Sequence, residues 1–122
     1  MSSNSNNMHH ERMAKMTFAS VFPLYLHKIE RKGRTKAELL EVIQWLTGYN
    51  EQDLDYHIQS HSTFTDFFEK ANLHPNVRLI TGMICGYRIE DIDNPLTQKV
   101  RYLDKLVDEL AKGRTMEKIL RT

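Results

Sequence analysis

The chain has 122 residues, of which 17 are basic and 16 acidic, for a formal net charge of +1. This length fits one domain that buries a core without support from disulfides or metals. The single cysteine, Cys85, cannot form an internal disulfide, which is typical of a reducing cytoplasm. No apolar run approaches the roughly 18 residues of a membrane span, and the polar N-terminus shows no signal-peptide core. The small net charge argues against a generally sticky nucleic-acid binder.

The N-terminal residues 1–14 are predicted to be a disordered tail that precedes a single helical domain over 15–122. Met is the only apolar residue type in 1–9, which is too little apolar surface to bury. His9 and His10 are adjacent, but a histidine pair in such a tail does not by itself indicate a metal site.

The first periodic segment follows the tail. Apolar residues from Phe18 to Ile29 recur at helical spacing. Proline is tolerated only in the first turn of a helix, because it lacks an N–H. With Pro23 in that first turn, the helix is predicted to begin near Ser20 and to end at Gly33.

Capping patterns mark the next three helix starts. Thr35 and Glu38 form a capping box before an apolar stripe that Gly48 ends. Asn50 precedes an acidic first turn, and Thr63 precedes a short helix with phenylalanines on one face.

Residues 75–87 are ambiguous. Pro75 suits the first position of a helix, and the apolar residues after it keep a helical period. The stretch is also rich in β-branched residues, so a hairpin around Gly82 is the alternative. A helix is preferred, because nothing else in the chain resembles a strand.

Asn94 and Pro95 are predicted to open a long helix that Gly113 ends, before a short final turn capped by Thr115. Its apolar stripe could pack on the rest of the chain or be shared between two chains as a homodimer; it comprises Leu96, Val100, Leu103, Val107 and Leu110. The predicted fold class is therefore all-α, a small orthogonal bundle of about six or seven short helices with one longer C-terminal helix.

The tetrapeptide Lys-Gly-Arg-Thr occurs at 32–35 and again at 112–115. In each copy the glycine is placed to end a helix and the threonine to begin the next one. We interpret the repeat as the same tight corner used twice.

Three segments carry a resemblance to a known family: 15–25 (KMTFASVFPLY), 79–88 (LITGMICGYR) and 94–113 (NPLTQKVRYLDKLVDELAKG). The chain resembles domain of unknown function 2200, a family of small bacterial proteins, from about His10 to Arg121. The resemblance implies a bacterial single-domain protein and supplies no catalytic residue.

No assembled catalytic set, cofactor motif or metal-binding motif is evident. His57 and His61 have the spacing of zinc ligands on a helix, but Ile58 stands where a metalloprotease has glutamate. They are interpreted as surface or helix-end histidines. Cys85 lies in an apolar run near a predicted helix end and is expected to be buried and inert.

The polar face of the long helix, with the residues just before it, offers the richest set of binding side chains. A ligand or partner site is expected there, formed by Tyr87, Arg88, Arg101, Tyr102 and Asp104.

Charge is segregated along the chain. Residues 28–36 carry a net charge of +4, 49–69 of −5 and 112–121 of +3. If the two basic segments meet, they form a patch suited to phosphates. The candidate nucleic-acid-binding residues are Arg31, Lys32, Arg34, Lys36, Arg114, Lys118 and Arg121.

The sequence therefore predicts a cytoplasmic binding module rather than an enzyme, and its partner is expected to be a protein or a nucleic acid. The alternative is a small enzyme or ligand-binding domain around Tyr87, Arg88, Arg101 and Asp104. No cofactor and no membrane association are expected.

Overall fold

The computed structural model describes the backbone of residues 2–121 and the side chains of residues 8–121. This part of the chain contains seven α-helices: α1 Ser2–Lys15, α2 Phe18–Glu30, α3 Lys36–Thr47, α4 Glu51–Gln59, α5 Phe64–Glu69, α6 Pro95–Ala111 and α7 Met116–Ile119. Between α5 and α6 lie two short 3-10 helices and a minimal hairpin: η1 Pro75–Leu79, β1 Met83–Ile84, β2 Tyr87–Arg88 and η2 Ile89–Asp91.

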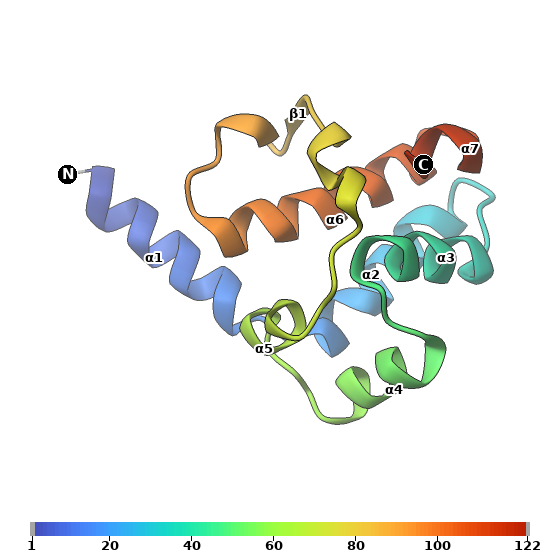
Figure 1. Ribbon diagram of the computed structural model, residues 1–122, viewed down its shortest axis with the longest axis horizontal. Coiled ribbons are helices and arrows are strands. Elements are labelled where there is room, and N and C mark those ends of the chain that lie inside the picture. Colours follow the sequence, from blue (N-terminus) through green and yellow to red (C-terminus); the bar gives the residue numbers. More distant parts are fainter. Residues whose placement is uncertain (1, 122) are drawn as a thin grey trace.

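Helix α6 runs through the middle of the molecule, and α1, α2, α3, α5 and α7 pack against it (Figure 1). Its residues Leu103, Leu106 and Leu110 are fully buried. On the other side of the core, the rings of Phe18 and Phe67 stack with centroids 4.3 Å apart. The predicted fold class, a small all-α bundle with one longer C-terminal helix, is confirmed.

The predicted helix starts are confirmed by their side-chain caps. Thr35 and Asn50 each form a complete capping box. Thr63, Asn94 and Thr115 accept a hydrogen bond from the backbone N–H three residues later. Capping depends on side chains within one turn, which is why the sequence reveals it.

The first helix begins at Phe18, two residues before its predicted start near Ser20. Thr17 caps α2, and Pro23 lies inside the helix. The early start is fixed from outside the helix, because Phe18 donates its N–H to the carbonyl of Ser62 and Phe64 donates to that of Met16. This short antiparallel bridge joins the beginnings of α2 and α5. The exposed ring of Pro23 then costs one helical hydrogen bond.

The preferred helix over 77–87 is wrong, and the hairpin alternative is confirmed. Strands β1 and β2 pair antiparallel, with Ile84 opposite Tyr87. Cys85 and Gly86 form the turn, with φ values of 50° and 83°. Two successive residues at positive φ are typical of a tight hairpin turn and end any right-handed helix. The turn therefore lies at 85–86, not at Gly82.

The expectation of a disordered tail over 1–14 also differs from the structure, which has helix α1 there. Met13 is buried in the core, and the hydroxyl of Thr65 donates to the carbonyl of Ala14. The helix forms because α5 and α6 provide surfaces for it to pack on, which its own composition does not reveal.

The apolar stripe of the long helix is used inside the chain. Val100, Leu103, Val107 and Leu110 are buried, and Leu96 is partly buried against them. This stripe is therefore covered within the chain, and homodimerisation through the long helix stays a prediction. Within residues 2–121, no helix is both long enough and apolar enough to cross a membrane.

Candidate functional site

The two Lys-Gly-Arg-Thr corners have the same backbone structure. In each corner the arginine N–H bonds to a carbonyl five residues earlier, from Arg34 to Ile29 and from Arg114 to Glu109. The glycines at 33 and 113 have φ values of 81° and 86°. This is the glycine-terminated helix end known as the Schellman motif. The interpretation of one tight corner used twice is confirmed.

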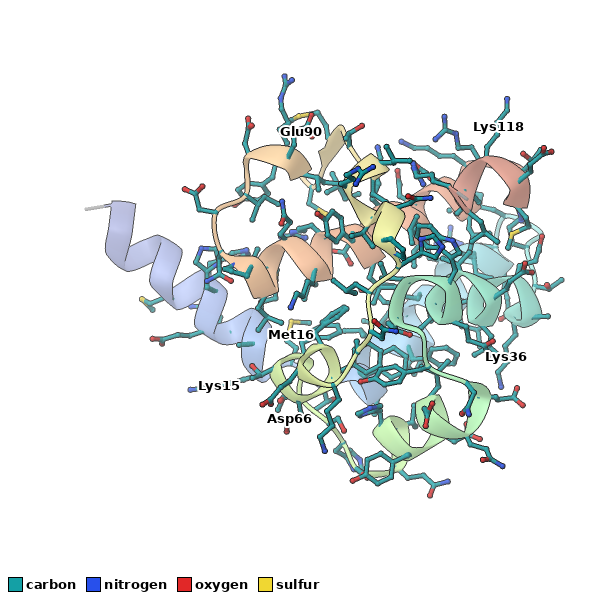
Figure 2. The ribbon with its side chains drawn as sticks, in the orientation of Figure 1. Lys15, Met16, Lys36, Asp66, Glu90 and Lys118 are labelled. Atoms are coloured by element: carbon teal, nitrogen blue, oxygen red, sulfur yellow. The ribbon has the colours of Figure 1, made fainter. Side chains whose placement is uncertain are left out.

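The two corners also contact each other. The Nη1 of Arg34 donates a hydrogen bond of 2.6 Å to the main-chain carbonyl of Arg114. The corner between α2 and α3 therefore lies beside the corner between α6 and α7, at the end of the molecule that carries Lys36 and Lys118 (Figure 2). The two basic segments of the sequence form one surface, which we call the basic face.

The basic face has a strong excess of positive charge. Its segments, 28–38 and 105–121, contain ten basic and five acidic residues, a net charge of +5. The remaining residues carry a net charge of −4. The chain is nearly neutral overall, but its basic face is positively charged and the rest of the chain is negatively charged.

Ion pairs divide the predicted basic residues into two groups. Arg34 pairs with Glu38 at 2.9 Å, and Arg114 and Arg121 both pair with Glu109. The other four, Arg31, Lys32, Lys36 and Lys118, are exposed to different degrees but share no ion pair with any residue of 8–121. Arg34, Arg114 and Arg121 are thus engaged within the chain, whereas the charges of the other four residues lie unpaired at the surface among the described residues.

Glu109 is the residue of this region that the sequence analysis missed. Its side chain is only 5% exposed, and its Oε2 accepts from Arg114 at 3.1 Å and from Arg121 at 2.7 Å. Its Oε1 is buried without a hydrogen-bond partner among the described residues. In the sequence, Glu109 resembles the other charged residues on a helix surface, so no local signal indicates its burial.

A polar recess of about 510 Å³ opens beside Glu109. It is lined mainly by charged side chains from α6, from the corner after it and from the C-terminal segment: Leu79, Thr81, Lys105, Glu109, Arg114, Lys118 and Arg121. Four of these side chains are cations and one is an anion, so the recess is strongly basic.

The second predicted site, on the polar face of the long helix, is only partly assembled. Arg101 lies over the ring of Tyr87, 5.5 Å from its centroid, and pairs with Asp104 at 2.9 Å. Asp104 also accepts a 2.6 Å hydrogen bond from the hydroxyl of Tyr25. Burial and the charge of Asp104 raise the pKa of Tyr25 well above its usual value. The network is internal, since Arg101 is only 8% exposed.

Two of the five predicted residues lie outside this network. Tyr102 is buried in the core, and burial raises its pKa. Arg88 is exposed and lies 3.8 Å from Asp91. Tyr87, Arg101 and Asp104 are thus brought together, whereas Tyr102 faces elsewhere.

A cleft of about 320 Å³ lies beside this network, between α1, the hairpin and the start of α6. His10 contributes its Nδ1 to a 2.6 Å hydrogen bond with the hydroxyl of Thr97. His9 stacks on Tyr87, with ring centroids 6.2 Å apart. Neither histidine was predicted to line a site, because residues 1–14 were expected to be a disordered tail.

Of the remaining candidates, His61 matches its predicted surface or helix-end position, whereas His57 and Cys85 differ from expectation. His57 is buried and hydrogen-bonded to the hydroxyl of Ser62 at 2.7 Å, so it is not a surface residue. His61 lies beyond the end of α4 at a φ of 52° and is exposed. Cys85 is exposed in the hairpin turn, which contradicts its expected burial. Within the described side chains, no cluster of three or more His, Cys, Asp or Glu is placed to hold a metal ion.

The fold and these surfaces define a small all-α protein with a pronounced basic face. The chain belongs to the DUF2200 family, described as an uncharacterized protein conserved in bacteria, and the family model matches residues 12–121. A crystal structure titled as that of the uncharacterized protein SP1917 is similar to it. The two chains are 44% identical and superpose with a TM-score of 0.84, over 90% of this chain and 91% of the other. A search among curated proteins found no match.

The burial of His57 generates a prediction about pH. Burial, with a contribution from the charge of Lys70, lowers the pKa of His57 below 6.5. The unfolded chain therefore binds this proton more readily, and the stabilisation that is present above pH 6.5 is lost as the pH falls through the lowered pKa. We expect urea unfolding between about pH 7.5 and about pH 5 to show this loss. This loss of stability at low pH should be smaller in His57→Gln and unchanged in His61→Gln. Equal pH dependence in both variants would contradict the prediction.

The Glu109 cluster generates a prediction about stability. Replacing Glu109 with Gln leaves the largely buried guanidinium of Arg121 without its charge partner. We expect a loss of about 3 kcal/mol in the free energy of unfolding. The matched control is Glu117→Gln at an exposed position of α7, which should change stability by no more than about 0.5 kcal/mol. Similar small effects for both variants, measured by chemical denaturation, would show that Glu109 does not hold this end together.

Proposed function

We propose that this protein is a cytoplasmic binding module that contacts nucleic acid through its basic face. The observation that carries the proposal is the hydrogen bond from Arg34 to the Arg114 carbonyl, which joins two separate basic segments into one surface. A net charge of +5 on this face attracts a polyanion.

The distribution of ion pairs supports phosphate as the group that is recognised. Arg31, Lys32, Lys36 and Lys118 are free of internal ion pairs within 8–121, so they can neutralise phosphates and release counterions. The negative charge of the other surfaces disfavours their contact with the same strand. The module would therefore bind in one orientation.

Salt dependence tests this function. Fluorescence anisotropy with labelled oligonucleotides at low salt should show binding that weakens with a log–log slope of about −0.9 per phosphate on duplex DNA and about −0.7 on single strands. The variant Arg31→Gln, Lys32→Gln, Lys36→Gln should bind about tenfold more weakly with a shallower slope.

The matched control removes the same charge elsewhere, in Lys15→Gln, Lys70→Gln, Arg78→Gln. All three residues are exposed outside the basic face. This control should retain most of the affinity. An absence of binding at low salt, or equal losses in the two triple variants, would reject the nucleic-acid function and favour an acidic protein as the partner.

The cleft beside Tyr87 supports a second candidate function, a small enzyme or ligand-binding domain. Its volume of about 320 Å³ is combined with hydrogen-bonding groups from His10, Asn94 and Thr97. A pocket of this size accepts a small polar molecule.

NMR spectroscopy separates the two candidates. If the cleft is a ligand site, titration with a panel of nucleotides, sugars and amino acids should shift the signals of His10, Tyr87 and Thr97 and leave Lys36 unchanged. The variant Thr97→Val should abolish the shifts, whereas Lys99→Gln should retain them. Shifts confined to the basic face, or no shifts, would reject the cleft as a ligand site.

A further inference from the structure

The recess at the α6–α7 end of the basic face differs from the rest of that face because its cations converge. Lys105 comes from α6, Arg114 from the corner, Lys118 from α7 and Arg121 from the C-terminal segment. The cations of the other corner, Arg31, Lys32 and Lys36, do not line this recess.

Three of the four cations in the recess are held in place by the protein. Lys105 donates to the carbonyl of Met83 at 3.0 Å, and Arg114 is fixed on Glu109. Arg121 donates to the carbonyls of Leu79 and Ile119 as well as to Glu109. A ligand that binds here does not have to order these side chains, which lowers the entropic cost of binding.

Glu109 keeps the positive charges together without filling the recess. Its carboxylate is buried and shared by the two arginines. Without it, the guanidinium groups of Arg114 and Arg121 would repel each other. The net charge of the groups around the recess is still +3.

The positive charge of the recess is greater than a phosphodiester inside a strand requires. A diester carries one negative charge and two free oxygens, whereas a phosphate monoester carries a charge of about −1.5 to −2 and three acceptor oxygens. Convergent cations favour the monoester, and a strand tracked along its length needs cations spread out in a line. Thr81 adds a hydroxyl to the lining.

We infer that the recess lined by Thr81, Lys105, Arg114 and Lys118 binds a phosphate monoester, the terminal phosphate of a nucleic-acid strand. This inference rests on the proposed function of the basic face and specifies which part of the strand is recognised there.

The experiment compares three labelled oligonucleotides of one sequence, carrying a 5′-phosphate, a 3′-phosphate or hydroxyls at both ends. We expect one phosphorylated form to bind the protein at least about tenfold more tightly than the form with two hydroxyls. Inorganic phosphate should remove this preference by competition and leave the residual binding. Competition that also abolishes all binding of the hydroxyl form would show a general anion effect and overturn the inference.

Two single variants localise the effect. Lys118→Ala removes an exposed cation of the recess and should abolish the preference for a terminal phosphate. Lys36→Ala removes an equal charge from the other corner and should weaken all three oligonucleotides equally while retaining the preference. Neither side chain has an internal ion pair among the described residues, so both variants are expected to fold.

The outcomes separate the inference from the function on which it rests. Equal binding of all three oligonucleotides overturns the terminal-phosphate inference and leaves the nucleic-acid function standing. Loss of the preference in Lys36→Ala but not in Lys118→Ala places the phosphate elsewhere and also overturns it. If none of the three oligonucleotides binds at low salt, the proposed function itself fails.

Discussion

The burial of α6 along its length is the constraint on which the rest of the structure depends. Five other helices and the first strand of the hairpin pack around it, and its leucine residues form the centre of the core (Figure 1). A helix of 17 residues extends over about 25 Å, so its two ends organise different surfaces. The first half carries Thr97 and Arg101, which contact His10 and His9 of α1. The second half carries Lys105 and Glu109, which line the basic recess.

At the C-terminal end of α6, the buried carboxylate of Glu109 holds neighbouring elements together, as apolar packing does elsewhere in the molecule. A buried carboxylate loses its hydration, and this cost is offset only when opposite charges and hydrogen bonds replace the water. Arg114 and Arg121 do so for the Oε2 of Glu109, and Arg121 also donates to the carbonyl of Leu79 in η1. The corner, the C-terminal segment and η1 are therefore tied to α6 by polar contacts. The same contacts that stabilise this end also leave basic groups at its surface.

The sequence predicted those parts of the fold that local chemistry determines. A cap needs a side chain and a backbone N–H three residues apart, so Thr35 and Asn50 could be recognised without knowledge of the fold. The hairpin and α1 could not be recognised in this way. Apolar spacing over 77–87 fits a helix as well as a hairpin, and the positive φ of Cys85 has no signal in a non-glycine residue. Helix α1 depends on the surfaces of α5 and α6, which exist only in the folded chain.

The sequence predicted where the basic residues of the candidate site lie, but not which of them form ion pairs within the chain. The two basic segments could be found from the charges in the sequence. The acidic partners of Arg34, Arg114 and Arg121 could not be predicted, because the fold brings Glu38 and Glu109 to them. The total charge of +1 was also a poor guide to nucleic-acid binding. At physiological ionic strength, charges are screened over about 8 Å, so a phosphate responds to its immediate surroundings. Asp66 and Lys118 lie on opposite sides of the view in Figure 2. Acidic groups as distant as Asp66 cannot cancel the basic face, and net charge does not exclude a polyanion from one end of a polarised molecule.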